Sequence, residues 1–275
     1  MSPTWDSNTH PEHDRVSPLG WLRFGLRAVL LVILVFGSLM LLLALRVVER
    51  PLFGIRRPLT PHITKWVCRN ALRILRLPLV VSGQPMRGQG AIVANHTSWL
   101  DIFVLNASDC VYFVSKSEVA GWPGIGWLAR ATGTVFIARD PKEAAAQKQV
   151  FEDRLLARHR LLFFPEGTST DGQQVLPFKS TLFAAFFAQD LREHLSVQPV
   201  SVVYHAPASA DPRFYGWWGD MGFGEHLITT LATARQGRVE VVYHAPIRVS
   251  DTQSRKQMAQ QAETLVRQGH EAARR

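Results

Sequence analysis

Two patterns of hydrophobic and polar residues divide the chain. Residues 28–45, AVLLVILVFGSLMLLLAL, contain no charged residue. From residue 78 onward, short apolar runs alternate with segments whose apolar residues recur at helical spacing. The first pattern is typical of a membrane helix, and the second of strands that alternate with helices.

The uncharged run is long enough to cross a membrane. As a helix it would extend about 27 Å, close to the roughly 30 Å hydrocarbon core of a bilayer. A signal peptide is the alternative, but its apolar part spans only about 7–15 residues and precedes small residues, whereas this run ends in Arg46. We therefore expect a retained transmembrane helix within residues 18–50, after a disordered tail, residues 1–17.

The basic residues near this run indicate its orientation. More arginine and lysine residues follow the run than precede it. Because cytoplasmic flanks carry the excess of positive charge, the C-terminal part is expected on the cytoplasmic side. The sequence thus predicts a single-pass protein of the inner (cytoplasmic) membrane.

Residues 51–77 contain a basic amphipathic pattern. Ile63, Trp66 and Ile74 recur at helical spacing, while Lys65 and Arg69 occupy the remaining surface. Such a helix can lie in the headgroup region of a membrane. The alternative is a helix that packs on the globular domain.

Residues 78–275 are expected to form one α/β domain. Strands are predicted where apolar runs are short and unbroken, namely in LVVSG, AIVANH, VYFVSK, TVFIAR, LLFFPEG, VQPVSVVY and VEVVYHAP. Helices are predicted over 142–158, 180–194, 221–234 and 251–273. The octets VSVVYHAP and VEVVYHAP recur 39 residues apart and are interpreted as two similar strands of one sheet.

Composition and charge narrow the classes of partner. A net charge of +9 and a pI near 10.1 suit nucleic acid, an anionic membrane or an anionic substrate. The hydrophobic share of 47% and the eight tryptophans favour the membrane, and no nucleic-acid-binding motif is present. Two cysteines are too few for a disulfide framework, which fits a reducing compartment.

The segment IVANHTSWLD, residues 92–101, carries the candidate catalytic pair. Asn95 and His96 end a predicted strand, at the sheet edge where open α/β sheets place their sites. Asp101 lies at the start of the following helix and can hydrogen-bond one nitrogen of His96, which leaves the other to accept a proton. Such a pair suits a reaction in which a hydroxyl of the substrate itself attacks.

Two further strand ends carry polar residues. In FFPEGTSTDG, Glu166 and Gly167 follow a buried strand, and the hydroxyls of Thr168 and Ser169 come next. A glycine turn with adjacent hydroxyls can hold an anion or a lipid headgroup. Arg139 ends the strand of GTVFIAR and could bind a phosphate through two hydrogen bonds.

Simpler explanations exist for each of these residues. Asn95 and Asn106 both stand in glycosylation sequons, but a buried strand end on the cytoplasmic side makes that use improbable. No second histidine or cysteine stands three or four residues from His96, so a metal site is disfavoured. Helix capping by Asp101, an ion pair for Arg139 and a plain turn at Gly167 remain open for each residue taken alone.

Taken together, these segments resemble the lysophospholipid acyltransferase family, typified by bacterial 1-acylglycerol-3-phosphate acyltransferase. The blocks that carry the resemblance, over about residues 78–250, are N-H-x-x-x-x-D at 95–101, G-x-x-F-I-x-R at 133–139, F-P-E-G-T at 164–168, V-x-P-V at 197–200 and a variant of L-P-F-K-x-G-x-F that retains Lys179. Their order and spacing make the resemblance specific. It implies a mixed, largely parallel sheet flanked by helices.

The resemblance also implies an activity. His96 would be the general base and Asp101 its partner, while Asn95, Arg139, the loop formed by Glu166, Gly167, Thr168 and Ser169, and Lys179 would bind substrate. The reaction would move a fatty acyl group from acyl carrier protein or CoA to the free hydroxyl of a lysolipid at the membrane, without a metal or cofactor. The first expected acceptor is 1-acylglycerol-3-phosphate, in phospholipid biosynthesis.

One departure from the family pattern favours a second acceptor. Ser169 stands where family members that accept a phosphate usually have arginine, and FPEGTSTDG resembles the branch that acylates lyso-ornithine lipid, an aminolipid without phosphate. Arg139 and Lys179 could still serve a phosphate. A membrane-anchored hydrolase is a competing class, but no G-x-S-x-G motif is present. A non-catalytic scaffold would not account for the intact blocks.

Overall fold

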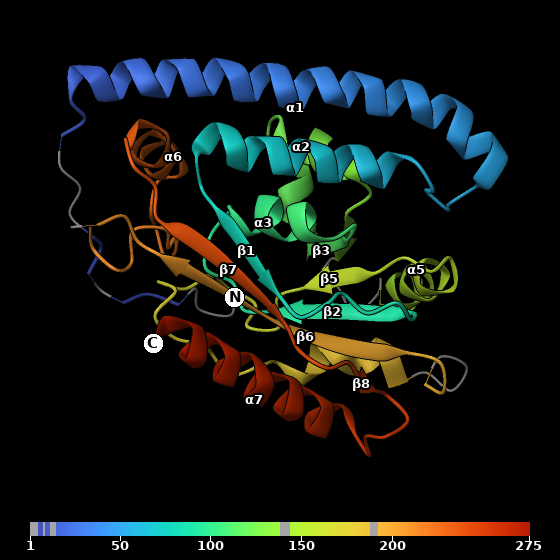
Figure 1. Ribbon diagram of the computed structural model, residues 1–275. Helices are drawn as coiled ribbons and strands as arrows, with labels where there is room; N and C mark the ends of the chain where they lie inside the picture. The colour runs from blue at the N-terminus through green and yellow to red at the C-terminus, as the bar shows by residue number, and fades with distance from the viewer. Residues whose placement is uncertain (1–4, 8, 12–14, 138–143, 188–191, 209) are drawn as a thin grey trace.

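A single mixed sheet forms the centre of the molecule (Figure 1). The computed structural model describes residues 5–7, 9–11, 15–137, 144–187, 192–208 and 210–275. These residues form an eight-stranded sheet in the order β1-β7-β6-β2-β5-β3-β4, with β8 paired to β6. The strands are β1 (Leu79–Ser82), β2 (Gly90–Ala94), β3 (Tyr112–Lys116), β4 (Val135–Ile137), β5 (Leu161–Phe163), β6 (Ser196–His205), β7 (Arg238–Tyr243) and β8 (Ile247–Arg248).

The pairing is parallel except around β6. β6 runs antiparallel to β7 and β8, whereas the pairs β1–β7, β6–β2, β2–β5, β5–β3 and β3–β4 are parallel. This confirms the expected mixed, largely parallel sheet. The carboxyl ends of β2, β3, β4 and β5 therefore lie at one edge of the sheet.

Helices cover both faces of the sheet (Figure 1). α1, α2 and α3 stack above one face, and α7 lies against the other, where it packs on β6. The helices are α1 (Pro18–Phe53), α2 (Thr60–Leu75), α3 (Asp101–Ser108), α4 (Ile125–Thr132), α5 (Ala144–Leu156), α6 (Phe223–Ala232) and α7 (Arg255–Arg274), with 3₁₀ helices η1 (Ser117–Gly121) and η3 (Ser180–Phe187).

Strand β2 lies at the centre of the core because helices cover both of its faces. All five of its residues are buried. Ile92 and Ala94 pack in the cluster on the side of α2 and α3, while Ala91 and Val93 pack in the cluster on the side of η3 and α7. Successive side chains of a strand point to opposite faces, so an unbroken apolar run is what a doubly covered strand needs.

The two similar octets form strands of one sheet, as expected, and the structure makes these strands neighbours. They lie in β6 and β7, which pair antiparallel, with Val202 opposite Val241. The equivalent tyrosines, Tyr204 and Tyr243, therefore lie at opposite ends of the paired segment.

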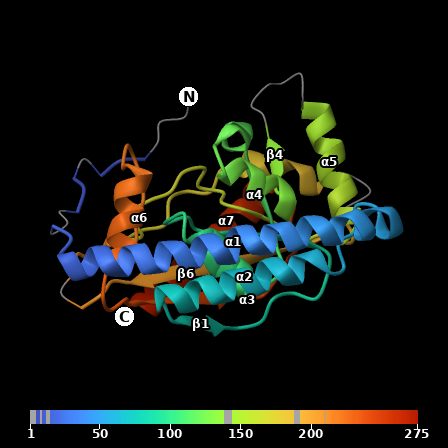
Figure 2. The same cartoon turned by 90° about the horizontal axis from the view of Figure 1, so that it is seen from above.

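Helix α1 lies lengthwise along the domain instead of projecting from it (Figures 1 and 2). It is 36 residues long and apolar enough to cross a membrane. Its inner side packs on α2 and α6, while large apolar side chains such as Leu22, Ile33 and Met40 are exposed on it. Helix α2 lies between α1 and α3. It therefore packs on the globular domain, which was the alternative to a helix in the headgroup region, although Trp66 stays exposed.

Polar contacts attach α1 to the domain near both of its ends. The Arg27 guanidinium donates hydrogen bonds to the carbonyl oxygens of Leu231 and Thr233, at the end of α6, at 2.7 Å each. Near the other end, the buried Glu49 carboxylate accepts from the backbone N–H of Thr60 at 3.1 Å and from its hydroxyl at 2.8 Å. Both contacts satisfy helix ends that would otherwise lack hydrogen-bond partners.

The segment predicted as a helix over 180–194 is a 3₁₀ helix, η3, where the structure describes it. Phe183 and Phe186 are both fully buried and three residues apart. A 3₁₀ helix has three residues per turn, so this spacing points both rings into the same core. Helix α4 and the 3₁₀ helix η1 were not predicted from the sequence.

The N-terminal segment contacts the loop that follows β6. The rings of Trp5 and His10 lie 6.0 Å and 5.5 Å from the ring of Trp218, and the Thr9 carbonyl accepts a hydrogen bond from Arg213 at 3.0 Å. The described part of residues 1–17 has no helix or strand before Pro18.

His159 is a buried titratable side chain just before β5. Its ring stacks on Tyr112 with 4.2 Å between ring centroids, and neither ring nitrogen has a hydrogen-bond partner in the part of the chain that the structure describes. Burial, together with the charges of Arg154 and Arg57, lowers the pKa of His159 from 6.5 to about 3. The folded protein therefore holds this imidazole neutral.

We predict that His159→Phe makes stability less sensitive to acid. The folded-state pKa lies below the unfolded value, so wild-type stability is complete above pH 6.5 and falls as the pH drops toward 3. In that window only the unfolded chain binds the proton, so the free energy of unfolding falls by about 1.4 kcal/mol for each pH unit. Urea unfolding of both proteins in the same detergent, from pH 7 to pH 4, measures the difference. Parallel losses of stability in both proteins would contradict it.

Candidate active site

The site lies where β2 ends at the carboxyl edge of the sheet. The strand stops at Ala94, and a turn leads through His96 into α3, which begins at Asp101. The turn closes with a hydrogen bond from the Asp101 N–H to the Ser98 carbonyl at 3.1 Å. This short connection brings a side chain from the strand end and one from the helix start together, as expected from the sequence.

His96 and Asp101 form a direct pair. Nδ1 of His96 lies 2.7 Å from Oδ2 of Asp101. Because the carboxylate is only an acceptor, Nδ1 carries the proton of a neutral imidazole, and Nε2 holds the free lone pair. The His96 side chain is 22% exposed, whereas the Asp101 side chain is fully buried. This arrangement leaves Nε2 of a partly exposed imidazole able to accept a proton.

The charge of Asp101 is stabilised by further donors. Its Oδ2 also accepts from the backbone N–H groups of Thr97 at 2.8 Å and Ser98 at 3.1 Å. Its Oδ1 accepts from the Tyr204 hydroxyl at 2.7 Å. Burial first, and then the negative charge of Asp101, raises the pKa of Tyr204 well above 10, so the phenol remains a donor. A buried carboxylate needs such donors to remain ionised.

Phe164 orients the plane of the His96 ring. Its ring stacks on His96 with 4.0 Å between ring centroids and an interplanar angle of 9°. Phe164 follows β5, the strand next to β2, so the stacking joins two strand ends. With the Asp101 hydrogen bond, the stacking leaves the imidazole little rotational freedom.

Glu166 binds the backbone instead of projecting into open space. It is 2% exposed, and its two oxygens accept from the N–H groups of His96 at 2.8 Å and Leu176 at 3.0 Å. Burial raises its pKa to about 8, although both N–H donors act in the opposite direction. The expected headgroup contact therefore does not suit this side chain. Its geometry is that of a clamp that holds the His96 backbone to the loop.

The loop after Glu166 encloses the histidine from a second side. The Thr170 N–H donates to the His96 carbonyl at 3.0 Å. Gly167 has φ +73°, and a Cβ added there would lie 2.6 Å from Nζ of Lys179, so the amine sits directly over the turn. The structure thus brings Lys179 to the loop that carries Thr168 and Ser169, both of which are partly exposed.

Asn95 extends the β2–β6 ladder beyond the last residue of β2. Its Nδ2 donates to the Val202 carbonyl, and its Oδ1 accepts from the Val202 N–H, both at 2.8 Å. The side chain is 1% exposed and its amide is engaged on both sides. The geometry therefore favours an architectural role over the substrate contact expected from the sequence. Arg139 lies outside the described residues.

Sequence reasoning missed three residues of this site. Tyr204 comes from β6, about a hundred residues away, and only the pairing of β6 with β2 brings its hydroxyl to Asp101. Phe164 was recognised as part of a block but not as a stacking partner, and Thr170 was not singled out. The repeated octet was the one signal that could have drawn attention to Tyr204.

Aromatic residues continue from the site toward α6. Nε1 of Trp99 donates to Nδ1 of the buried His226 at 2.9 Å. Trp99 and Trp217 each pack against Phe223, with 5.6 Å and 5.9 Å between ring centroids. Because α6 packs on α1, these rings extend from the catalytic pair toward the apolar helix. Trp99, Trp217 and Phe223 thus form one aromatic cluster.

Comparison with known proteins agrees with this geometry. A family model described as Acyltransferase matches residues 79–203. The chain is 55% identical over 267 residues to a Rhodobacter capsulatus protein named lyso-ornithine lipid O-acyltransferase. The aligned region covers 97% of this chain and 97% of that protein. A Pseudomonas aeruginosa protein of the same name is 34% identical over 210 residues, with 76% of this chain and 79% of that protein covered.

A solved structure shares the fold. The crystal structure of the 1-acyl-sn-glycerophosphate (LPA) acyltransferase PlsC from Thermotoga maritima aligns with a TM-score of 0.63 at 22% identity and covers 93% of this chain and 95% of that one. Since the alignment covers this much of both chains, it includes most of the N-terminal helical region as well as the sheet.

We predict that Asn95→Ala lowers stability by about 2–6 kcal/mol. The substitution leaves the buried N–H and carbonyl of Val202 without their partner, at roughly 1–3 kcal/mol each. Asn106→Ala is the matched control, because its Nδ2 donates one hydrogen bond to a helical carbonyl, that of Ile102. Chemical unfolding in detergent should give the smaller loss for the control. Equal losses would contradict the architectural role of Asn95.

Proposed function

The chain belongs to the lysophospholipid acyltransferase family, and on that premise we propose that it transfers a fatty acyl group from a thioester to the free hydroxyl of lyso-ornithine lipid. It is an acyltransferase that acts on lysolipids. The observation that carries the mechanism is the 2.7 Å contact between His96 and the buried Asp101.

The choice of acceptor follows from the relatives and from one residue of the loop. Two bacterial relatives described above match most of this chain. Both are named lyso-ornithine lipid O-acyltransferase. Ser169 stands where acceptors of a phosphate monoester usually have arginine, and an aminolipid without phosphate needs no such guanidinium. We therefore favour lyso-ornithine lipid over 1-acylglycerol-3-phosphate, the acceptor that the sequence motifs first suggested.

The proposed reaction uses His96 twice. Its Nε2 takes the proton of the acceptor hydroxyl while the oxygen attacks the thioester carbonyl. When the tetrahedral intermediate collapses, the C–S bond breaks and the sulfur leaves with the proton from His96. Asp101 stabilises the imidazolium between these steps, and Tyr204 stabilises Asp101. Base catalysis of this kind contributes about 10²–10⁴ in rate.

The remaining site residues would bind the substrates. Lys179 above Gly167 offers a positive charge to an anionic part of the substrate, and the Thr168 and Ser169 hydroxyls are partly exposed beside it. Arg139 is proposed for the same task on the basis of its motif. The donor is expected to be acyl carrier protein or CoA in thioester linkage, with no metal or cofactor taking part.

Membrane association is proposed through the outer face of α1. That face exposes large apolar side chains along the helix, and 6% of the most apolar 18-residue stretch of α1 is buried in the protein. Because Arg27 and Glu49 tie both parts of α1 to the domain, the helix would keep its inner side on the domain and present its exposed apolar side to the bilayer. The excess of arginines after the apolar run supports the cytoplasmic side for the domain.

We expect the purified full chain to acylate lyso-ornithine lipid with a kcat/KM at least about tenfold above that for 1-acylglycerol-3-phosphate. The loss of one charge-assisted phosphate contact accounts for a factor of this size. Products are identified by mass after incubation with each acceptor and with acyl-CoA or acyl carrier protein as donor. His96→Ala is the blank and should lose about a hundredfold or more of the activity.

Ser169→Arg tests the explanation for this preference. The new guanidinium should raise kcat/KM for 1-acylglycerol-3-phosphate while that for lyso-ornithine lipid stays the same or falls. A wild-type preference for the phosphate acceptor would overturn the proposed acceptor. Substantial activity in well-folded His96→Ala would overturn the proposed base.

We also predict that Tyr204→Phe lowers kcat by about tenfold or more with little change in KM. It removes the hydroxyl donor from the buried Asp101 carboxylate, a contact worth roughly 1.5–3 kcal/mol when the acceptor is charged. Tyr243→Phe is the matched control, because this tyrosine holds the equivalent octet position and contacts Ser108 instead. Steady-state kinetics of both variants should separate them. An unchanged kcat in Tyr204→Phe would show that Asp101 does not need this donor.

A further inference from the structure

Arginines line a cavity at the edge of the sheet opposite the catalytic pair. Among the described residues, the cavity of about 640 Å³ is bordered by Leu43, Arg46, Val47, Arg50, Gly54, Ile55, Arg57, Arg130, Ala131 and Arg154. His96 and Glu166 follow the carboxyl ends of β2 and β5, whereas Gly133, next to this cavity, and Arg154 precede β4 and β5. The cavity is therefore separate from the proposed active site.

Few of these positive charges are neutralised within the described structure. Arg46 contacts Glu49 at 2.9 Å, but that carboxylate is already used by the start of α2. No acidic side chain of the described residues forms an ion pair with Arg50, Arg57 or Arg130. Burial, and to a smaller extent the charge of Arg57, lowers the pKa of Arg154 to about 10.

Helix capping explains only part of this cluster. Arg57 and Arg154 donate to the carbonyl oxygens of Ala131 and Gly133, at the end of α4. Each guanidinium has five N–H donors, so most of them remain for a ligand. Nε of Arg154 is buried without a partner in the described structure, and the exposed guanidinium groups of Arg50 and Arg130 form no hydrogen bond with the described residues. The cluster therefore has more donors than the fold requires.

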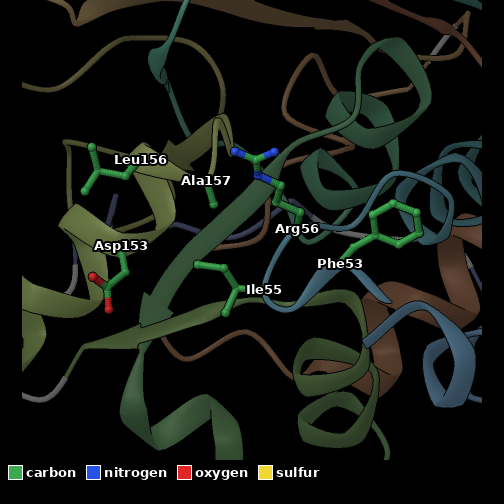
Figure 3. Close-up of a pocket in the computed structure, with 6 residues that line it drawn as sticks. All are labelled: Phe53, Ile55, Arg56, Asp153, Leu156 and Ala157. Atoms are coloured by element: carbon green, nitrogen blue, oxygen red, sulfur yellow. The ribbon is translucent and has the colours of Figure 1, made fainter. Parts of the chain in front are cut away.

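An apolar pocket adjoins the arginines. Figure 3 shows this pocket, of about 350 Å³, in which Asp153 and Leu156 of α5 and the next residue, Ala157, lie opposite Phe53 at the end of α1 and Ile55 and Arg56 just after it. Ile55 borders both the pocket and the arginine cavity. Phe53, Ile55 and Leu156 are about half exposed or more, as are Leu43 and Val47 on α1. Positive charge and apolar surface thus meet at the end of the proposed membrane helix.

We propose that this cavity binds the phosphodiester of an anionic phospholipid, with an acyl chain along the apolar side chains of α1 and α5. Arginine binds phosphate oxygens through paired hydrogen bonds, and several arginines around one cavity suit a phosphodiester. The walls formed by Leu43 and Val47 of α1 make the cavity reachable sideways from a bilayer. A soluble donor would use the charges but not the apolar walls. The site depends on the contact of α1 with a membrane and not on the identity of the acceptor.

Direct binding tests the proposal without turnover. The full chain in dodecyl maltoside is titrated against fluorescent phosphatidylglycerol and fluorescent phosphatidylcholine with identical chains, and anisotropy gives each Kd. We expect phosphatidylglycerol to bind at least about tenfold more tightly than phosphatidylcholine, because one charge-assisted hydrogen bond is worth roughly a factor of ten in Kd. The double variant Arg50→Gln/Arg130→Gln should remove this difference. Neither arginine belongs to the proposed catalytic machinery, so kcat of the variant should be retained.

The matched control is Arg73→Gln/Arg76→Gln, which removes the same charge from the exposed end of α2 beside α1. It should leave the preference for phosphatidylglycerol intact. Equal binding of the two lipids, or equal losses in both double variants, would overturn the proposal. Glycerophosphoglycerol, the headgroup without chains, should displace the lipid poorly. Displacement by free phosphate or CoA at the concentration of the lipid would assign the cavity to a soluble anion and likewise overturn it.

Discussion

The active site depends on one buried negative charge, the carboxylate of Asp101. A carboxylate that is removed from water is costly unless donors surround it. Here the donors come from His96, from the N–H groups of Thr97 and Ser98, and from the Tyr204 hydroxyl. These groups belong to the end of β2, the turn before α3 and the strand β6. The charge that pairs with His96 therefore also fixes the relative position of three segments.

A second buried acidic side chain, that of Glu166, completes this arrangement from the opposite side. Glu166 binds the N–H groups of His96 and Leu176, and Phe164 stacks on the His96 ring. The backbone and the ring of the histidine are thus held by the loop after β5, while its Nδ1 is held by Asp101. The remaining nitrogen, Nε2, is the part of this side chain left for a proton transfer. Such restriction places the base before the substrate arrives, which is how positioning contributes to rate.

The sequence predicted the parts of this fold that local patterns specify. Strands β2 and β5 are unbroken apolar runs because helices cover both faces, and His96 and Asp101 are five residues apart in a single turn. Tyr204 could not be found in this way, because its contact depends on the register of β6 against β2. Helix α4 was missed for a similar reason. Arg57 and Arg154, distant in sequence, cap the carbonyls at its end, and its eight residues form only about two turns, too short for a clear periodic pattern.

The positive net charge of the chain has a specific location in this structure. If the arginines served only to attract anionic substrate, they would be expected around His96. Instead, Arg46, Arg50, Arg57, Arg130 and Arg154 gather at the opposite edge of the sheet, at the end of α1. Toward its other end, α1 packs on α6, whose Phe223 belongs to the aromatic surface beside Trp99. One helix therefore links the two places where lipid chemistry is expected. An anionic lipid at the arginines and a lysolipid at His96 would both approach along the same apolar face, which explains why a catalytic domain should hold so long a helix flat against itself.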